Sequence, residues 1–286
     1  MAEPHLTLHT ALQQGTHLLE QAGIESPRLT AEVLLAHALR KDRTYLYTYP
    51  EQLLREVEWI HYGRYLHERL RRKPTQYITR QQEFYGRPFY VTPGALIPRP
   101  ETEHLIETVL HLPRITGPIL DVGTGSGAIA VTLALELNRA VIAIDLSPAA
   151  LAIAHRNAKT LNAPVHFLQA DSLTAIAPAT AGLIVSNPPY VAESDRISLQ
   201  PEVRDWEPNL ALFAGEHGLD FYRRLIPEAA QTLRPGGTLV MEIGAGQSTN
   251  IAALFGPDWS APVFTPDLAG IPRVISGTFL ASHGHT

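Results

Sequence analysis

The sequence of 286 residues predicts a doubly wound α/β domain that follows a small N-terminal helical bundle. From residue 119 onward, short β-favouring apolar runs alternate with helical segments, which is typical of a parallel sheet with crossover helices. Three of these runs are followed by acidic or polar residues at their carboxyl ends, where ligands bind in such sheets. Residues 6–80, by contrast, have mainly helical periodicity.

Three amphipathic segments make up the predicted bundle. The first covers residues 8–19, and Ser26-Pro27 supplies an N-cap and a first-turn proline for the second, which runs to residue 39. Pro50 opens the third, which runs to residue 70 and is stopped by Lys73-Pro74. We expect these helices to pack on a core of their own, because they carry no recognisable chemistry.

A hairpin linker is expected over residues 84–91, since aromatic and β-favouring residues flank Gly86. A helix follows over 101–110, after a proline-rich segment. The sheet then begins, and its last strand, over 273–280, is expected to be antiparallel. The other expected strands are 119–122, 141–145, 165–170, 183–186 and 238–243, and the helices between them are 126–137, 148–161 and 219–233.

A glycine-rich loop, Gly123-Thr124-Gly125-Ser126-Gly127, follows the first strand of the sheet. Glycines let a ligand approach the backbone closely. The dinucleotide fingerprint needs its third glycine one residue later, and a P-loop needs Gly-Lys-Ser/Thr, so the sequence fits neither. Asp145 ends the next strand and can accept hydrogen bonds from both ribose hydroxyls. The pattern favours a nucleoside with an amino-acid tail and no pyrophosphate, as in S-adenosylmethionine.

The third strand repeats this pattern, and Asp171 and Ser172 are expected to contact the adenine. A single Asp at a strand end is more often a helix N-cap or a turn residue. Acids in register at successive strands favour a binding site. Cofactor binding is therefore predicted for Gly123, Thr124, Gly125, Ser126, Gly127, Asp145, Asp171, Ser172 and Asn187.

The tetrapeptide Asn187-Pro188-Pro189-Tyr190 follows the strand 183–186. Prolines lack an N–H and fix φ near about −65°, so the backbone leaves the sheet with free carbonyl acceptors. A planar NH2 group needs two acceptors in its plane, which the Asn187 side chain and the Pro188 carbonyl can supply. Tyr190 offers an apolar wall for a flat amide or base. The alternative is a strand-ending turn, since both proline dipeptides are common in turns.

Composition excludes several function classes. The chain has no Cys, which removes disulfides, thiolate metal sites and the covalent route to cytosine-C5 methylation. The 13 His residues are scattered and the nearest pair is His283 and His285, so no metal site is expected. The net charge of −5 argues against a protein that mainly grips phosphate backbone. Neither a membrane helix nor a signal peptide is recognisable, which favours the cytoplasm.

One basic stretch stands apart from this acidic balance. It contains few acids, and its basic residues form either a solvated helix face or a surface that docks a partner. They are Arg64, Arg69, Arg71, Arg72, Lys73, Arg80 and Arg87.

Over nearly its whole length the chain resembles the PrmC/HemK family, the N(5)-glutamine methyltransferases that modify the Gly-Gly-Gln motif of peptide chain release factors. The specific carriers are Pro98-Arg99-Pro100-Glu101-Thr102-Glu103, Ser186–Tyr190 and the helical N-terminal domain. The glycine loop and Pro235-Gly236-Gly237 are generic to methyltransferases. Two positions depart from relatives: many have Asp where Thr30 stands, and some have Trp where Ser172 stands, so that only the Ser172 backbone is expected to contact adenine.

The resemblance implies a Rossmann-like class I S-adenosylmethionine-dependent methyltransferase domain at residues 95–286, a β-hairpin linker at 83–94 and a helical substrate-recognition domain at 1–82. The implied reaction methylates the glutamine amide nitrogen of class 1 release factors in the cytoplasm and modulates translation termination, with neither direct nucleic acid binding nor membrane attachment. Asn187, Pro188 and Tyr190 are the expected catalytic residues, and these three with Pro189 are expected to bind the substrate. Arg99, Glu101 and Thr102 lie either near the ligands or in an ordinary approach to a helix, and receive no catalytic role.

Three other functions fit parts of the sequence. Asn-Pro-Pro-Tyr also suits N6-adenine methylation in DNA, although such enzymes usually carry a target-recognition domain and a basic groove. Methylation of a ribosomal-protein glutamine would use the same pocket. A non-enzymatic, cofactor-binding regulatory protein would leave that pocket without a use.

Overall fold

The structure is a computed structural model that describes residues 6–113 and 115–280. The described chain divides into two compact units. The first comprises the residues up to Arg80 together with Gln200–Trp206, and the second comprises Gln81–Leu199 and the residues from Glu207 onward. A short segment far along the sequence thus belongs to the unit that the N-terminal helices form.

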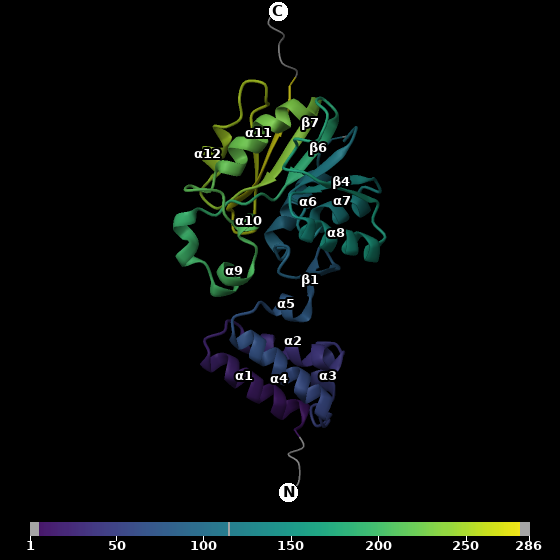
Figure 1. Ribbon diagram of the computed structural model, residues 1–286, viewed down its shortest axis with the longest axis vertical. Coiled ribbons are helices and arrows are strands. Elements are labelled where there is room, and N and C mark those ends of the chain that lie inside the picture. Colours follow the sequence, from purple (N-terminus) through teal and green to yellow (C-terminus); the bar gives the residue numbers. More distant parts are fainter. Residues whose placement is uncertain (1–5, 114, 281–286) are drawn as a thin grey trace, which may run out of the picture. The chain divides into compact units, whose positions relative to one another are not determined.

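The first unit is a helical bundle (Figure 1). It contains α1 (Leu8–Gln21), α2 (Pro27–Leu39), α3 (Arg43–Thr48), α4 (Glu56–Leu70), α5 (Thr75–Thr79) and α9 (Pro201–Trp206). Its core includes the buried side chains of Leu8, Leu34 and Tyr62. Gly15 lets α1 pass close to α4, because a Cβ there would lie 1.9 Å from the Tyr62 hydroxyl oxygen. The expected bundle with its own core is confirmed.

The start of the third predicted helix was wrong, and Ser26 is the N-cap of α2 as expected but without a side-chain cap. The helix predicted from Pro50 is α4, and it begins at Glu56. The Glu58 carboxylate accepts the Arg55 backbone N–H at 3.0 Å and so closes a capping box at this point. Ser26 makes no capping hydrogen bond, since its backbone is left-handed with φ 49°. Pro27 at the first position of α2 still fits the helix start, because its fixed φ is helical.

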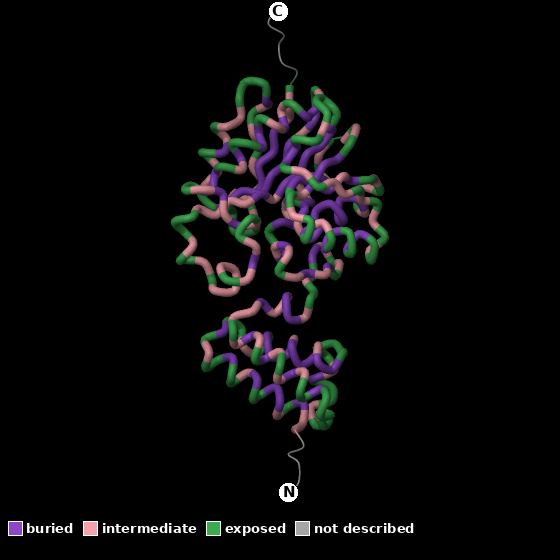
Figure 2. The backbone as a smooth tube through the Cα atoms, viewed as in Figure 1, coloured by how far each residue is buried: buried purple, intermediate pink, exposed green. Residues whose placement is uncertain are grey.

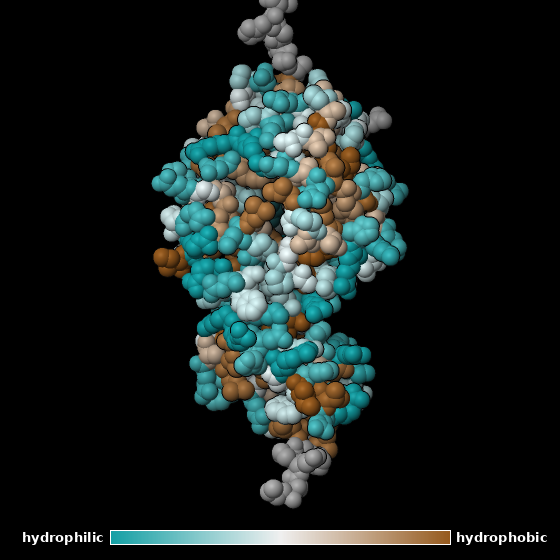
Figure 3. All heavy atoms as spheres, viewed as in Figure 1, coloured by the Kyte–Doolittle hydropathy of each residue, from teal (hydrophilic) through white to brown (hydrophobic). Residues whose placement is uncertain are grey.

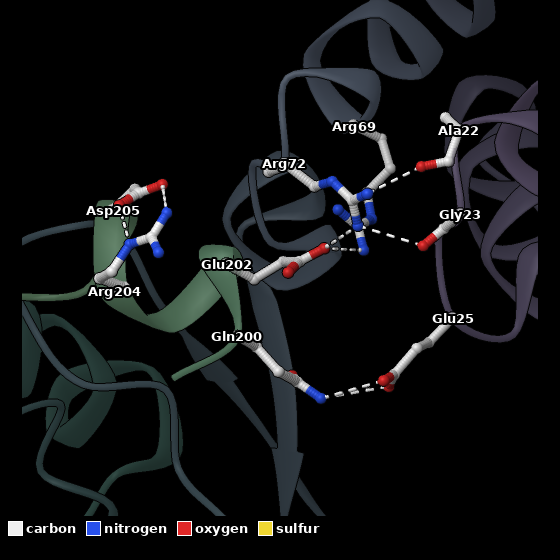
Figure 4. Close-up of polar contacts among 9 residues, drawn as sticks. All are labelled: Ala22, Gly23, Glu25, Arg69, Arg72, Gln200, Glu202, Arg204 and Asp205. Carbon is white, nitrogen blue, oxygen red and sulfur yellow. Dashed lines mark hydrogen bonds and ion pairs between the residues drawn. The ribbon is translucent and has the colours of Figure 1, made fainter. Parts of the chain in front are cut away.

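Part of the basic stretch is used inside the first unit (Figure 4). Arg69 on α4 donates to Glu202 on α9 at 2.8 Å, and Arg72 donates to the Ala22 carbonyl oxygen at 2.7 Å. Lys73 pairs with Glu68 at 2.6 Å. These three cations therefore bind the chain to itself, which fits neither a solvated face nor a free docking surface.

The second unit begins with a hairpin, β1 (Gln81–Phe84) and β2 (Arg87–Tyr90), which confirms the predicted turn at Gly86. A seven-stranded sheet follows in the order β5-β4-β3-β6-β7-β9-β8. Strands β3 to β7 pair in parallel, and β9 is antiparallel to both of its neighbours. The sheet strands are β3 (Ile119–Val122), β4 (Val141–Asp145), β5 (Val165–Gln169), β6 (Ala181–Ser186), β7 (Leu233–Glu242), β8 (Val263–Pro266) and β9 (Pro272–Thr278).

Helices cover both faces of this sheet, so the predicted doubly wound fold with an antiparallel last strand is confirmed. One face packs on α6 (Glu103–Leu110), α7 (Ala128–Glu136) and α8 (Pro148–Leu161), and the other on α11 (Asp220–Thr232) and α12 (Ser248–Ala252). Ile119 and Leu120 point to opposite faces because strand side chains alternate. The central strands β3 and β6 are buried along their whole length, whereas the edge strands β5 and β8 are not (Figure 2). The shorter elements are η1 (Pro100–Thr102), η2 (Glu193–Ser198) and α10 (Asn209–Leu212).

The strand order places β3 at the point where the connections change direction. β4 and β5 follow on one side of β3, whereas β6 and β7 lie on the other. Ligands bind beyond the carboxyl ends of the strands at such a switch point.

On the face in view, hydrophobic residues are scattered among hydrophilic ones (Figure 3). Within residues 6–113 and 115–280, no helix combines the length and the apolar character that crossing a membrane requires.

Candidate active site

A cavity of about 610 Å³ opens at the carboxyl ends of the parallel strands. This volume suits a ligand of nucleoside size, since small-molecule sites typically measure ~300–1,000 Å³. Its wall includes many of the predicted site residues: Gly123, Thr124, Gly125, Ser126, Asp145, Asp171, Ser172, Asn187 and Pro189. Gly127, Pro188 and Tyr190 are not among the lining residues. Residues 208–215 add a wall that the sequence analysis did not assign, with Leu210 and Phe213 as its large apolar members.

The glycine loop combines two different requirements. Gly123 has φ +73°, and a Cβ there would meet nothing within 4 Å, so this glycine leaves open space at the cavity. Gly127 has φ +80°, and its Cβ would lie 3.0 Å from the Ala154 Cβ on α8. The first glycine therefore makes room for a ligand, and the third lets the loop pack against a helix.

Asp145 joins the loop to the next strand end. Its Oδ2 accepts the Gly125 N–H at 2.9 Å, and its Oδ1 accepts the Ser147 N–H at 2.8 Å. Burial raises the pKa of this carboxyl, while the backbone donors Ser147 and Gly125 oppose the shift. Each oxygen keeps a further lone pair for a hydroxyl donor. The two Asp145 oxygens can therefore accept hydrogen bonds from both hydroxyls of a ribose.

Asp121 is a site residue to which the sequence analysis gave no role. It is fully buried, and its Oδ2 accepts the Thr124 hydroxyl at 2.6 Å and the Ala130 N–H at 3.1 Å. These bonds tie the start of the loop to the first turn of α7. Burial raises its pKa to about 7, and no described residue bonds to its Oδ1. An acid two residues before a glycine loop was the available signal.

Asp171 and Ser172 reach the cavity with different side-chain environments. The two Asp171 carboxylate oxygens accept from Arg224 at 3.1 and 2.7 Å, and both side chains are about half exposed. Ser172 has φ 54°, and its buried Oγ has no partner within the described part of the chain. The adenine contacts of Asp171 and Ser172 stay a prediction. When a ligand binds, Asp171 either remains paired with Arg224 or exchanges this pair for a contact with the adenine.

The tetrapeptide Asn187-Pro188-Pro189-Tyr190, called the acceptor motif from here on, is fixed by hydrogen bonds at its start. The Ser186 hydroxyl donates to the Val122 carbonyl at 2.7 Å, and the Asn187 Nδ2 donates to the Thr102 hydroxyl oxygen at 3.1 Å. Among residues 6–113 and 115–280, no hydrogen bond is made to the Asn187 Oδ1 or to the Pro188 carbonyl oxygen. Both oxygens are therefore free of bonds from the described residues, but of the two residues only Asn187 lines the cavity, and their role as acceptors for a ligand stays a prediction.

Tyr190 is partly buried and does not line the cavity. Its carbonyl accepts from Gln247 Nε2 at 3.0 Å, and a Cβ on Gly218 would lie 2.2 Å from that carbonyl oxygen. Burial raises the pKa of the Tyr190 phenol well above its usual range, so the hydroxyl stays protonated. Within the described residues this hydroxyl makes one side-chain hydrogen bond, a long one to Glu242 at 3.5 Å.

The proline-rich segment before α6 is fixed by a buried acid. Arg99 donates from Nη2 to Glu207 Oε1 at 2.5 Å, and the Ile97 N–H donates to the other Glu207 oxygen at 3.3 Å. Thr102 donates to Glu242 at 2.6 Å. Arg99 thus braces the cavity wall next to Pro208, whereas Thr102 lines the cavity and contacts the acceptor motif. No group of acidic and histidine side chains in the described residues is arranged to hold a metal ion.

Comparison with known proteins gives consistent matches along the chain. The model of the PrmC N-terminal domain matches residues 10–79, and that of the methyltransferase small domain matches residues 101–201. A release factor glutamine methyltransferase of Koribacter versatilis is 49% identical over 276 residues, covering 95% of this chain and 98% of the relative. One of Nitratidesulfovibrio vulgaris is 41% identical, covering 95% of each chain. A methyltransferase of known structure from Pyrococcus furiosus, 18% identical, covers 68% of this chain and 90% of its own with a TM-score of 0.51, which supports the fold alone.

Proposed function

The chain belongs to the family of release factor glutamine methyltransferases, and we propose from this that it methylates the glutamine of the Gly-Gly-Gln motif in class 1 peptide chain release factors. The methyl donor is S-adenosylmethionine, and the acceptor atom is the side-chain amide nitrogen. The observation that carries the proposal is a pair of adjacent oxygens without bonds from the described residues, Asn187 Oδ1 and the Pro188 carbonyl, of which Asn187 lines a nucleoside-sized cavity.

The cavity residues fit the cofactor. Gly123 leaves space at the loop, and Asp145 offers carboxylate lone pairs at the position expected for the ribose. Leu210 and Phe213 add apolar surface for the flat base. When bound, S-adenosylmethionine supplies a methyl group on a positively charged sulfonium.

The acceptor residues answer a specific chemical problem. An amide nitrogen is a poor nucleophile, because its lone pair is delocalised into the carbonyl. When Asn187 Oδ1 and the Pro188 carbonyl oxygen each accept one N–H, they hold the NH2 group in plane and increase electron density on nitrogen. Most of the rate gain then comes from alignment, which reaches large effective molarities in well-oriented reactions. The acceptor motif contains no strong base, so the proton leaves after methyl transfer, when the nitrogen is acidic.

The helical bundle is proposed to recognise the protein substrate in the cytoplasm, without direct nucleic acid binding. Its match to the PrmC N-terminal domain supports this role. The bundle also exposes Val57 and Ile60, at 50% and 58%, three residues apart on one face of α4. Replacing both with Ser should raise the KM for the release factor and leave cofactor binding unchanged; an unchanged KM would remove this face from the recognition surface.

The function is tested by label transfer. The purified protein is incubated with methyl-labelled S-adenosylmethionine and, separately, with a release factor, ribosomal proteins and adenine-containing DNA. Label on the Gly-Gly-Gln peptide, lost when its Gln is replaced, supports the proposal. Label only on a ribosomal protein or on DNA would keep the acceptor chemistry and overturn the substrate.

A further inference from the structure

A buried carboxylate next to the acceptor motif takes no part in the reaction described above. Glu242 ends β7 and is 2% exposed, and its Oε2 accepts the Thr102 hydroxyl at 2.6 Å. Thr102, itself 3% exposed, receives the Asn187 Nδ2 at 3.1 Å. Tyr222 fixes the Glu242 backbone by donating to its carbonyl oxygen at 2.9 Å. Three side chains from separate segments thus form one chain of hydrogen bonds that ends at the acceptor motif.

The direction of these hydrogen bonds follows from which groups can donate. An ionised carboxylate only accepts, so the single hydroxyl hydrogen of Thr102 goes to Glu242. The Thr102 oxygen then has only lone pairs left for Asn187, which must present its NH2 group to it. Because the NH2 and the oxygen of an amide lie on opposite sides of its carbon, Oδ1 is left for a donor from elsewhere. Asn187 lines the cavity, where such a donor would bind.

We propose that Glu242 and Thr102 are positioning residues that lock the Asn187 amide in the orientation that accepts from a primary amide. This inference rests on the proposed function and adds its specificity device. A flipped Asn187 would place its own NH2 against the substrate NH2, donor against donor, and would remove one of the two acceptors. The lock also disfavours an acceptor group that carries no N–H to donate.

The protonation state of Glu242 makes this lock dependent on pH. Burial raises its pKa to about 7; Glu101 adds to the shift, while Thr102, Arg273 and Tyr190 oppose it. A protonated Glu242 can donate to Thr102, which frees the Thr102 hydrogen to point at Asn187 instead. The lock therefore forms as pH rises through about 7, and turnover should rise with it.

The test compares variants of the full-length protein at the Thr102 hydroxyl. Thr102→Val keeps the shape and removes both the donor and the acceptor, and Thr102→Ser restores them. We expect Thr102→Val to lower kcat by about 10- to 100-fold, less than the roughly 100- to 1,000-fold lost with a preorganised donor that contacts the reacting group, because Thr102 acts through Asn187. The affinity for S-adenosylmethionine, measured by calorimetry, should change less than about threefold. Thr102→Ser should recover most of the lost kcat. Glu242→Gln should lower kcat and flatten its pH dependence near 7.

Thr108→Val is the matched control. Thr108 lies on α6, and its partly buried hydroxyl bonds to the His104 carbonyl at 2.7 Å and to Thr265 at 3.1 Å, outside the cavity lining. The same loss of a hydroxyl there should leave kcat unchanged. Equal loss of kcat in Thr102→Val and Thr102→Ser, or none in either, would overturn the lock.

A second readout does not depend on the substrate. The Asn187 side-chain NH2 signal in a ¹⁵N spectrum, identified by its absence in Asn187→Ala, should move in Thr102→Val and stay near its place in Thr102→Ser. If wild type fails to label a release factor, the proposed function fails, and the NH2 signal still decides the lock. If wild type labels the release factor and the Asn187 NH2 signal is the same in wild type, Thr102→Val and Thr102→Ser, the lock alone is wrong.

Discussion

Arg69 and Glu202 form a hydrogen-bonded ion pair at 2.8 Å, although they are 133 positions apart in the sequence. Both side chains are largely buried, at 8% and 16% exposure. The segment that follows the acceptor motif therefore passes through the helical bundle as α9 before it returns at Glu207. Glu207 then holds Arg99 and begins the wall of residues 208–215. In the sequence, α9 thus lies between the acceptor motif and the residues that begin this wall.

The first prediction concerns this ion pair. Glu202→Gln leaves the buried Arg69 charge without a counter-ion, and losing one partner of a buried pair costs about 3–5 kcal/mol. Since Glu202 keeps some exposure, we expect about 2–3 kcal/mol, seen as faster amide hydrogen exchange in α9 and the end of α4. Glu25→Gln is the control, because the hydrogen bonds of the Glu25 carboxylate to described residues are exposed ones to Gln200 at 3.2 Å. Equal exchange in both variants would show that the pair does not anchor α9.

The second prediction concerns Asp145. Asp145→Asn replaces one acceptor oxygen with an NH2 group, which only donates. The variant side chain can therefore no longer accept from both Gly125 and Ser147, nor from both ribose hydroxyls. Hydrogen bonds to charged groups are worth about 1.5–3 kcal/mol, so the affinity for S-adenosylmethionine should fall by roughly 10- to 100-fold. Isothermal titration calorimetry measures this directly.

Asp171→Asn is the matched comparison for that measurement. The Asp171 carboxylate already pairs with Arg224 and is about half exposed, so its loss should weaken cofactor binding by less than about fivefold. A loss as large as that of Asp145→Asn would show that Asp171 exchanges its arginine for the cofactor.

The parts of the molecule that follow short-range rules were the predictable ones. The helix 148–161 was expected with the bounds that α8 has, because Ser147 and Pro148 mark its start and Asn162 its end. β8 was missed, since it is four residues long and ends at a proline. The Thr102–Glu242 contact was not predictable either, because it joins residues 140 positions apart and each looks ordinary in its own segment. Long-range polar pairs, such as Arg69 with Glu202, leave no local pattern in a single sequence.

The third prediction concerns the acceptor residue itself. Asn187→Ala removes Oδ1, and with it one of the two acceptors for the substrate amide, so we expect kcat to fall at least about 100-fold. Cofactor affinity should stay within a few-fold of wild type, because the loop and Asp145 are untouched. Single-turnover rates and calorimetry separate the two effects. Asn250→Ala, an exposed position on α12, should change neither quantity. A parallel loss of turnover and cofactor binding would contradict the role of Asn187.

The last prediction concerns stability and the buried Asp121. Its pKa is raised from 3.8 to about 7 in the folded protein, chiefly by burial. The folded state then holds a proton that the unfolded chain has already lost, so this group stabilises the fold at low pH and the contribution is lost as pH rises through about 7. Asp121→Asn has no such titration. It also keeps one acceptor oxygen for Thr124 and Ala130.

The difference in unfolding free energy between Asp121→Asn and wild type should therefore shift in favour of the variant as pH rises from about 5 to about 8. The shift is roughly 3 kcal/mol, because each pKa unit corresponds to about 1.4 kcal/mol. Urea unfolding of both proteins across this pH range measures it, and other titrating groups cancel in the difference because the two proteins share them. Glu136→Gln, on the surface of the same unit, is the control and should show no such trend. A constant difference between the Asp121 variant and wild type would mean that Asp121 is ionised throughout, and that its unpartnered Oδ1 is stabilised by a donor other than the described side chains.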